Sequence, residues 1–259
     1  MGIGVESSHH EAARSQHEID LRYTDALTMA DHATTYRLVV KEIALKNGVY
    51  ATFMPKPLKA ENGSGMHVHQ SLFKGDKNSF YDKTDKNHLS KIGKNYIAGL
   101  LKFAPEFSIV TNQWVNSYKR LIQGFEAPVN VSWAKKNRSA LVRLPAYKSG
   151  YERAMRAELR SPDAACNPYL VFSVMLAAGL EGIKQGLELP DPVEHDARDL
   201  TMLPQSLGEA ITVAEKSKFL KEALGEHIYH SLIENKKIEW NKYCEEITNY
   251  ELEKYLSVL

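Results

Sequence analysis

Apolar residues recur about every 3.6 positions between Thr24 and Lys46, with polar residues between them. This periodicity predicts an amphipathic helix, and the Asn47-Gly48 pair that follows is a typical helix end. The apolar run at 169–185 is hydrophobic nearly all round and follows Asn167-Pro168, so it predicts a buried helix with a capped start. Three further helices are predicted, at 88–103, 205–223 and 239–256.

Strand patterns are concentrated in the front and middle of the chain. Residues 66–72 and 140–144 alternate between apolar and polar positions, and 49–54 is a short apolar run cut off by Pro55. Residues 74–86 are polar and rich in turn residues, which predicts a surface loop. No repeat, low-complexity tract or linker divides the sequence, so we expect one domain over residues 1–259.

Composition narrows the class of protein. Hydrophobic residues make up 43% and charged residues 25% of the chain, as in ordinary globular proteins. The 33 Lys and Arg nearly cancel the 32 Asp and Glu, so no global field favours nucleic acid or an anionic membrane. No apolar run approaches the roughly 20 residues of a membrane span, and the N-terminus does not resemble a secretory signal. The two cysteines predict reduced thiols and a cytoplasmic location, with a single disulfide as the alternative.

Two acidic residues near the N-terminus are candidates for holding a metal. A hairpin turn at Arg14-Ser15 would place Glu11 directly opposite Glu18, and a helix would also bring residues seven apart to one face. Carboxylates so close repel each other unless a cation lies between them. Oxygen ligands suit Mg²⁺ or Mn²⁺, whereas the alternative is a solvated acidic hairpin.

Two histidines and several arginines are the other candidates. His67 and His69 point to one face of a predicted strand, after a Gly-rich stretch that lets the backbone approach a ligand. They are either ligands for metal and phosphate or half-exposed strand histidines. The chain has neither a P-loop nor a Rossmann glycine motif. Guanidinium groups pair well with phosphate and carboxylate, although a solvated basic surface is the alternative. The arginines in question are Arg120, Arg138, Arg143, Arg153, Arg156 and Arg160.

These motifs, taken in order, resemble those of prokaryotic (type I) glutamine synthetases over essentially the whole chain. The resemblance implies an α+β fold with a curved antiparallel sheet backed by helices. It rests on Val5–Glu11 with Gln16–Asp20, on Lys56-Pro57 through Asn62–His69, on Asn116–Arg120, on Gly124–Pro128, on Asn137–Ala140 with Arg143, and on Arg156–Arg160 with Pro162–Tyr169.

The resemblance also implies roles for particular residues. Glu11 and Glu18 would bind the metal beside the reacting carboxylate, and His67 and Glu158 the metal beside the ATP phosphates. Glu126 and Arg138 would be catalytic, with Glu126 on a loop that closes over glutamate. The residues implied around the nucleotide are Glu6, His69, Ser71, Arg138, Arg143, Arg153 and Arg156; those implied around glutamate are Asn62, Gly63, Arg120 and Arg160.

The implied reaction is a ligation with ATP and Mg²⁺ or Mn²⁺ as cofactors. The side-chain carboxylate of glutamate attacks the terminal phosphorus of ATP, and ammonia then displaces phosphate from the acyl phosphate to give glutamine. Metals and arginines neutralise the charge that spreads over the phosphoryl oxygens. A closing loop excludes water, and a carboxylate such as Glu126 can take a proton from ammonium.

The sequence departs from the family in three ways. It begins within the family's catalytic domain, without the small N-terminal β-domain and an early strand that carries further metal ligands. From this we expect the isolated chain to form little glutamine. Arg14-Ser15 stands where the family usually has Pro-Gly, and Arg198 stands where some relatives carry a tyrosine that is adenylylated.

Two alternatives to glutamine synthesis stay open at this stage. One is a ligase of the same family that joins glutamate to a larger amine, such as a polyamine. The other is an inactive fragment, or half of a split enzyme, that binds nucleotide or a partner subunit. The resemblance suggests a homo-oligomer for a full-length protein, with small-molecule substrates and neither nucleic acid nor a membrane as partner.

Overall fold

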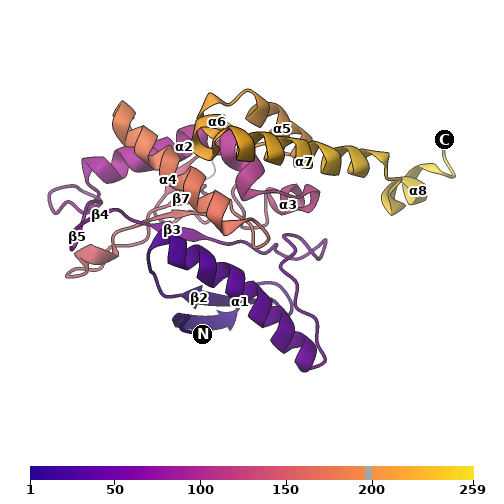
Figure 1. Ribbon diagram of the computed structural model, residues 1–259, viewed down its shortest axis with the longest axis horizontal. Coiled ribbons are helices and arrows are strands. Elements are labelled where there is room, and N and C mark those ends of the chain that lie inside the picture. Colours follow the sequence, from indigo (N-terminus) through magenta and orange to yellow (C-terminus); the bar gives the residue numbers. More distant parts are fainter. Residues whose placement is uncertain (196–199) are drawn as a thin grey trace.

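The computed structural model describes residues 1–195 and 200–259, so Arg198 lies outside the described residues. The architecture is α+β, with small sheets packed against helices (Figure 1). The strands are β1 (Val5–His10), β2 (His17–Leu21), β3 (Val68–Gln70), β4 (Phe73–Lys74), β5 (Lys77–Asn78), β6 (Trp133–Ala134), β7 (Val142–Arg143) and β8 (Ala157–Leu159). The helices are α1 (Ala26–Lys46), α2 (Lys91–Thr111), α3 (Val115–Arg120), α4 (Pro168–Gln185), α5 (Leu207–Glu215), α6 (Lys218–Leu224), α7 (Glu226–Glu245) and α8 (Asn249–Tyr255), with a 3-10 turn at Glu152–Ala154.

The central sheet has four short strands in the order β3-β8-β7-β6. The β3–β8 and β8–β7 pairs are antiparallel, as expected, whereas β6 and β7 run parallel. In Figure 1 a layer of helices lies above this sheet, and the β1–β2 hairpin with α1 lies below it. The sheet is therefore positioned between a helical core and an acidic hairpin.

Helices α2 and α4 pack against each other almost backbone to backbone. A Cβ atom on Gly99 would lie 2.1 Å from the carbonyl oxygen of Ala178, and one on Gly182 would lie 2.3 Å from that of Asn95. Only glycine permits so close an approach. The fully buried residues of these helices join those of β7 and β8 in one hydrophobic core that supports the sheet from the helical side.

The helix predictions hold best where the end signals are local. The helix predicted at 24–46 begins at Ala26, after the Asp25 cap, and α4 begins at Pro168, where the Asn167 side chain accepts the backbone N–H groups of the first turn. Helix α2 starts later than predicted because His88 has a positive φ of 55°. It also runs past Pro105 to Thr111, because the buried residues of its last turns outweigh the hydrogen bond that proline removes.

Other predicted elements were wrong in extent or type. The helix predicted at 205–223 is two helices, because Ser217 caps a new one. The helix predicted at 239–256 is α7, which begins at Glu226, followed by the separate α8. Residues 49–54 form no strand, since this run is irregular and Tyr50 is exposed to solvent.

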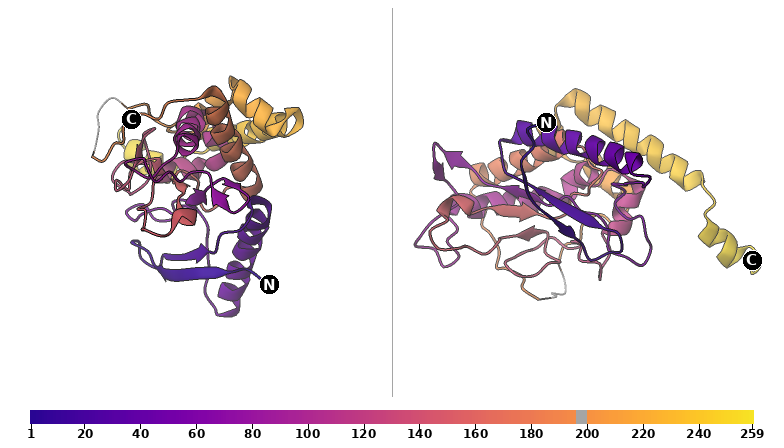
Figure 2. Two further views of the ribbon diagram at one scale, coloured as in Figure 1. Left: turned by 90° about the vertical axis from the view of Figure 1, so that its left-hand side faces the viewer. Right: turned by 90° about the horizontal axis from the view of Figure 1, so that it is seen from below.

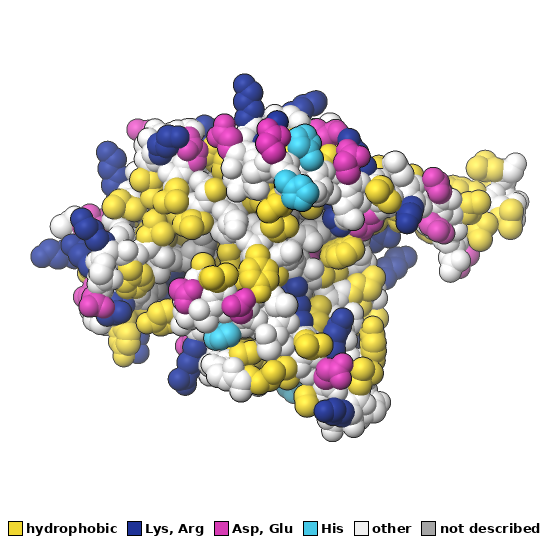
Figure 3. Space-filling view, in the orientation of Figure 1, with side chains coloured by type: hydrophobic (Ala, Val, Ile, Leu, Met, Phe, Trp, Pro, Cys, Tyr) yellow, Lys and Arg dark blue, Asp and Glu magenta, His cyan; other side chains and the backbone are white. Residues whose placement is uncertain are grey.

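The C-terminal segment extends away from the rest of the molecule (Figure 2). Helix α8 has no buried residue, and the apolar side chains of Ile247 before it and Leu256 after it are exposed. Figure 3 shows hydrophobic side chains in yellow on this projecting end of the molecule. None of the helices in the described ranges combines the length and apolar character that a membrane crossing requires. Cys166 and Cys244 are both free thiols, the first buried and the second exposed.

Candidate functional site

The β1–β2 hairpin gathers three side chains that suit a metal ion. His9 lies opposite Glu18 in the register, and Glu11 follows the end of β1. One ligand atom from each of the three lies within 4.8 Å of the others, with His9 Nε2 3.2 Å from a Glu11 oxygen and 3.4 Å from a Glu18 oxygen. Two carboxylates and an imidazole can coordinate a divalent cation.

The predicted register of this hairpin was wrong by two residues. Glu11 does not lie directly opposite Glu18, because its backbone N–H donates to the carbonyl of Gln16. The turn is closed by Gln16 N–H and the Ala13 carbonyl, and Ser15 supplies the required positive φ of 55°. The two carboxylates are diagonal neighbours instead and still meet at the end of the hairpin.

The electrostatics of the pair are those of two acids sharing one proton. A hydrogen bond with Glu11, together with burial, raises the pKa of Glu18 to about 7. The same contact with Glu18 lowers the pKa of Glu11. The cause is that two carboxylates so close cannot both ionise without a compensating charge. A divalent cation between them would supply that charge.

The central sheet aligns a second group of candidates in one row. Glu158 on β8 lies opposite His69 on β3 and opposite Arg143 on β7. Its side chain is almost fully buried and accepts hydrogen bonds from Arg143 Nε at 2.5 Å and Arg160 Nη1 at 2.8 Å. His67 Nδ1 lies 3.5 Å from the same carboxylate. Glu158 is therefore the centre of the cationic group.

Both histidines of this group are kept neutral. Burial, reinforced by the neighbouring guanidinium of Arg160, holds the pKa of His67 well below its usual value. Burial also lowers the pKa of His69, while the carboxylates of Glu158 and of Asp20 on β2 act in the opposite direction. Asp20 influences the pKa of His69 because the β1–β2 hairpin lies next to the central sheet (Figure 1). A neutral imidazole is the form that binds a metal.

The Gly-rich loop, residues 62–65, is packed tightly against Arg120. A Cβ on Gly65 would lie 2.5 Å from Arg120 Nη2, and a Cβ on Gly63 would lie 2.5 Å from the carbonyl oxygen of Pro55. Arg120 is buried and donates to the backbone carbonyls of Ser161 and Arg160. Burial lowers its pKa to about 10. Arg120 thus supports the Gly-rich loop, and its guanidinium already donates hydrogen bonds to acceptors within the protein.

Gln16 joins the hairpin to the Gly-rich loop. Its Nε2 donates to the Gly63 carbonyl at 3.1 Å and to the Ser64 hydroxyl at 3.2 Å. Arg14 Nε also lies 3.6 Å from a carboxylate oxygen of Glu61. The acidic cluster and the glycine loop are therefore held as one unit on the same side of the sheet.

The remaining predicted residues lie around these groups. Arg156 Nε donates to His69 Nδ1, and Arg138 Nη1 lies 3.6 Å from Glu126, which is exposed and has a positive φ of 48°. Arg153 lies apart, against Asp76 and the ring of Phe73.

Among the described residues, three of the predicted side chains make no hydrogen bond or ion pair. In the two described ranges the side chains of Glu6, Asn62 and Ser71 make no hydrogen bond with other residues. Glu6 is exposed on β1, and the other two are half-buried.

Sequence reasoning did not assign roles to His9 or Gln16. A signal for His9 was present, since Ser7, His9 and Glu11 alternate in a run that reads as a strand and so share a face. The link from Gln16 joins residues 47 and 48 positions apart, and no local pattern predicts such a contact.

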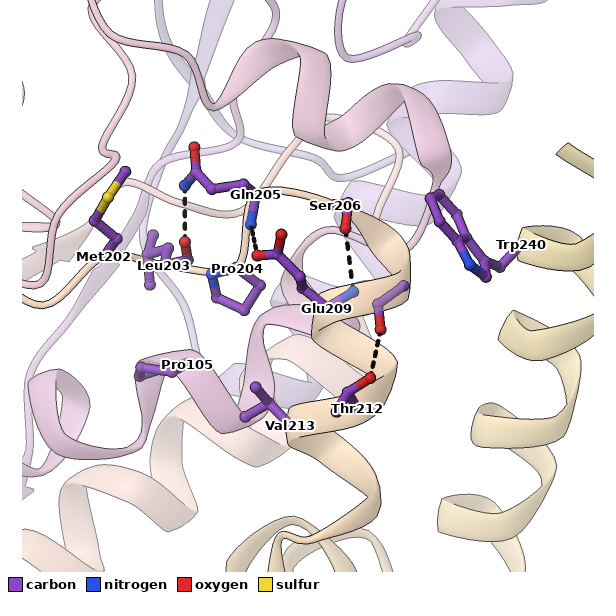
Figure 4. A pocket seen from close by; sticks show the side chains of 11 residues that line it. Pro105, Met202, Leu203, Pro204, Gln205, Ser206, Glu209, Thr212, Val213 and Trp240 are labelled. Atoms are coloured by element: carbon purple, nitrogen blue, oxygen red, sulfur yellow. Dashed lines mark hydrogen bonds between the residues drawn. The ribbon is translucent and has the colours of Figure 1, made fainter. Parts of the chain in front are cut away.

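A hollow of the surface lies away from these residues. It is a groove of about 690 Å³ at the joint of α2, α5 and α7, shown in Figure 4 with Trp240 at one side and Met202 at the other. The polar groups drawn there are occupied in capping α5: Ser206 Oγ accepts the Glu209 N–H, and Glu209 accepts the Gln205 N–H. None of the predicted site residues lines this groove.

Comparisons with known proteins agree on one family. The family model for the glutamine synthetase catalytic domain matches residues 1–255. Glutamine synthetase of Mycobacterium tuberculosis is 52% identical over 268 residues, and that of Methanosarcina mazei is 50% identical over 269 residues. Each alignment covers 100% of this chain and 60% of the relative. The chain thus spans about 60% of the length of these curated relatives.

Solved structures show the same fold. A GmaS–ADP complex superposes with a TM-score of 0.91 at 32% identity and covers 99% of this chain and 60% of that one. Plasmodium falciparum glutamine synthetase, solved by cryo-electron microscopy, superposes with a TM-score of 0.89 at 29% identity over 98% of this chain and 59% of that one.

Proposed function

The chain belongs to the glutamine synthetase catalytic-domain family, and we propose that it supplies the metal- and nucleotide-binding part of an active site that ligates ammonia to glutamate. The reaction joins ammonia to the side-chain carboxylate of glutamate and splits ATP into ADP and phosphate. Because the chain spans about 60% of its relatives, this activity is proposed for the assembled site to which the chain contributes.

The observation that carries the proposal is the cluster of His9, Glu11 and Glu18. Their ligand atoms lie within 4.8 Å of one another, and the pKa of Glu18 is raised to about 7 by Glu11. Such crowding destabilises the carboxylates unless a cation is bound, and the donor set fits Mg²⁺ or Mn²⁺. When bound, the ion would draw the oxygens of glutamate or phosphate into the site and neutralise their charge.

A second position for a divalent ion is proposed at His67 and Glu158. The imidazole is neutral and lies 3.5 Å from the buried carboxylate, so the two offer one nitrogen and one oxygen on the same side. Arg143 and Arg160 donate hydrogen bonds to this carboxylate and fix its orientation. They also add positive charge where the triphosphate would lie.

Exposed guanidinium groups suit the binding of phosphate. Arg138 is largely open to solvent and Arg156 is half-buried. The contacts of Arg138 with Glu126 and of Arg156 with His69 lie at the surface, so both guanidinium groups can turn toward an anion without breaking a buried contact. Arg138 can thereby stabilise charge on the transferred phosphoryl group. The superposed GmaS structure is a complex with ADP, which supports a nucleotide-binding role for this fold.

Glutamate binding is proposed at the Gly-rich loop, beside Asn62 and Gly63. We propose an indirect role for Arg120 rather than direct contact with glutamate, because both of its terminal nitrogens already donate to backbone carbonyls. It would fix the loop. Arg160 would meet the substrate through Nη2, the terminal nitrogen for which the described residues offer no hydrogen-bond partner. Glu126, exposed on its own loop, can take a proton from ammonium as the amide forms.

Calorimetry with Mn²⁺ tests the proposal directly. We expect Glu11→Gln to weaken Mn²⁺ binding by at least about tenfold, because one of the two carboxylates loses its charge. Glu42→Gln, on the exposed face of α1, is the matched control and should bind as the parent does. Equal affinity of Glu11→Gln and the parent would contradict the metal assignment.

The substrate is tested separately by phosphate release from ATP and glutamate. Release that depends on ammonium and is not supported by putrescine supports glutamine formation. Release with putrescine alone would assign the chain to the ligases for larger amines. The rate with the isolated chain is expected to be small, so the assay needs a sensitive phosphate detector.

A further inference from the structure

The loop that carries Glu126 is held by few contacts. Residues 122–126 are exposed except Phe125, while Leu121 and Ala127 on either side are buried. Within the described ranges, residues 123–128 make no backbone hydrogen bond to the rest of the protein. The position of the loop therefore depends on side-chain contacts.

Phe125 is the side chain of this loop that turns inward. Lys56 Nζ lies 3.4 Å from the centre of its ring, within the range of a strong cation–π contact. Lys56 is only 8% exposed, so water screens this contact little. The other contact of the loop, Glu126 with Arg138 at 3.6 Å, joins two exposed side chains and contributes little.

Lys56 is itself fixed in place by three further hydrogen bonds. Asn116 Oδ1 accepts its backbone N–H at 2.7 Å, and Asn116 Nδ2 donates to its carbonyl at 3.0 Å. Its ammonium group also donates to the backbone carbonyl of Glu61, the residue before Asn62. One ammonium therefore contacts both the start of the Gly-rich loop and the loop that carries Glu126.

We propose that Lys56 and Phe125 form a cation–π latch that holds the 122–126 loop closed against the Gly-rich loop. Lys56 is then a positioning residue: it acts on Glu126 through Phe125 and touches no substrate. The role of the latch in catalysis rests on the proposed function, since it couples glutamate at Asn62 and Gly63 to closure of the Glu126 loop. The latch itself is a property of the folded chain.

Limited proteolysis with a glutamate-specific protease, followed by mass spectrometry, tests the latch in the full chain without substrates. Lys56→Met removes the charge and keeps the aliphatic stem, and Phe125→Leu removes the ring. We expect each to raise the rate of cleavage after Glu126 by roughly two- to thirtyfold, the range that a cation–π contact implies. Cleavage after Glu234, which is exposed on α7, should stay unchanged. Lys59→Met, an exposed lysine of the same turn, is the control and should leave the loop unaltered.

The combined variant distinguishes a latch from two independent effects. If Lys56 and Phe125 act on each other, the double variant is cleaved after Glu126 no faster than the more affected single variant. Lys56→Arg, which keeps a cation over the ring, should restore slow cleavage. Unchanged cleavage in Phe125→Leu, or effects that multiply in the double variant, would overturn the latch.

Failure of the latch and failure of the proposed function give different results. Faster cleavage after Glu126 in the variants supports the latch even if the chain neither binds Mn²⁺ nor forms glutamine. Unchanged cleavage refutes the latch and leaves the metal-binding test untouched. In a catalytically active assembly, the latch predicts that Phe125→Leu raises the KM for glutamate more than the KM for ATP.

Discussion

Replacing Glu158 by glutamine removes the one negative charge at the centre of the cationic row. Glu158→Gln keeps the shape of the side chain but leaves Arg160, which is 6% exposed, facing a neutral amide. Arg143 Nε loses its charged partner as well. The buried guanidinium groups then repel each other without compensation, so we expect the folded state to be destabilised.

The size of the effect follows from burial. Removing one partner of a fully buried ion pair costs about 3–5 kcal/mol. Arg143 is 31% exposed, so water screens its share, and the lower end of that range applies. We expect a loss of about 3 kcal/mol, which corresponds to a fall in Tm of roughly 6–12 °C for a chain of this size.

Urea unfolding followed by fluorescence of the three tryptophans measures this loss. Glu234→Gln is the matched control, because Glu234 is 67% exposed and pairs with Lys237 on the surface of α7. The control should change stability by less than about 0.5 kcal/mol. A loss below about 1 kcal/mol for Glu158→Gln would refute the reasoning that this carboxylate balances both arginines. The same variant should also bind Mn²⁺ more weakly, which calorimetry measures.

Three further predictions concern the Gly-rich loop, the pair of Glu11 and Glu18, and the C-terminal segment. Gly65→Ala should cost about 1–3 kcal/mol in urea unfolding, because its Cβ would lie 2.5 Å from an Arg120 nitrogen that is already bonded; an unchanged midpoint would contradict the close packing. Mn²⁺ affinity should rise as pH increases toward about 7 and then level off, because the ion must displace the proton that Glu18 retains below its raised pKa. Calorimetry between pH 5.5 and 8 measures this, and a constant affinity over that range would disprove it. Deleting residues 248–259 should leave the unfolding midpoint unchanged, since α8 buries no side chain, and a lower midpoint would show that the segment packs onto the domain.

Much of the helical layer was predictable because its signals are local. The 3.6-residue period and the caps at Asp25 and Asn167 fix α1 and α4 within two residues. The first half of α7 was missed, although Tyr229, Leu232, Ile233 and Lys236 follow helical spacing. One of these four buried positions is a lysine, which lies over the ring of Trp114, and that partner is distant in sequence. Because Lys236 occupies one of the four buried positions, the apolar periodicity of this segment is incomplete.

The candidate site was predictable in its residues and less so in its arrangement. Alternation along 156–160 indicates which side chains share a face, but the strands beside β8 come from residues about 15 and 90 positions earlier. The register of the hairpin depends on the turn closed between Ala13 and Gln16, and the composition of the turn did not determine it. The loop contacts of Lys56 and Gln16 are tertiary, so no periodicity reports them.

The contact between α2 and α4 limits where this protein can move. With only backbone atoms between Gly99 and Ala178, neither helix can slide or rotate against the other without a steric clash. Small shifts in a packed bundle are normally absorbed by side chains that change rotamer, and Gly99 and Gly182 have no side chain that could do so. Any opening and closing around a ligand must therefore be accomplished by the loops on the far side of the sheet, against a foundation that stays still.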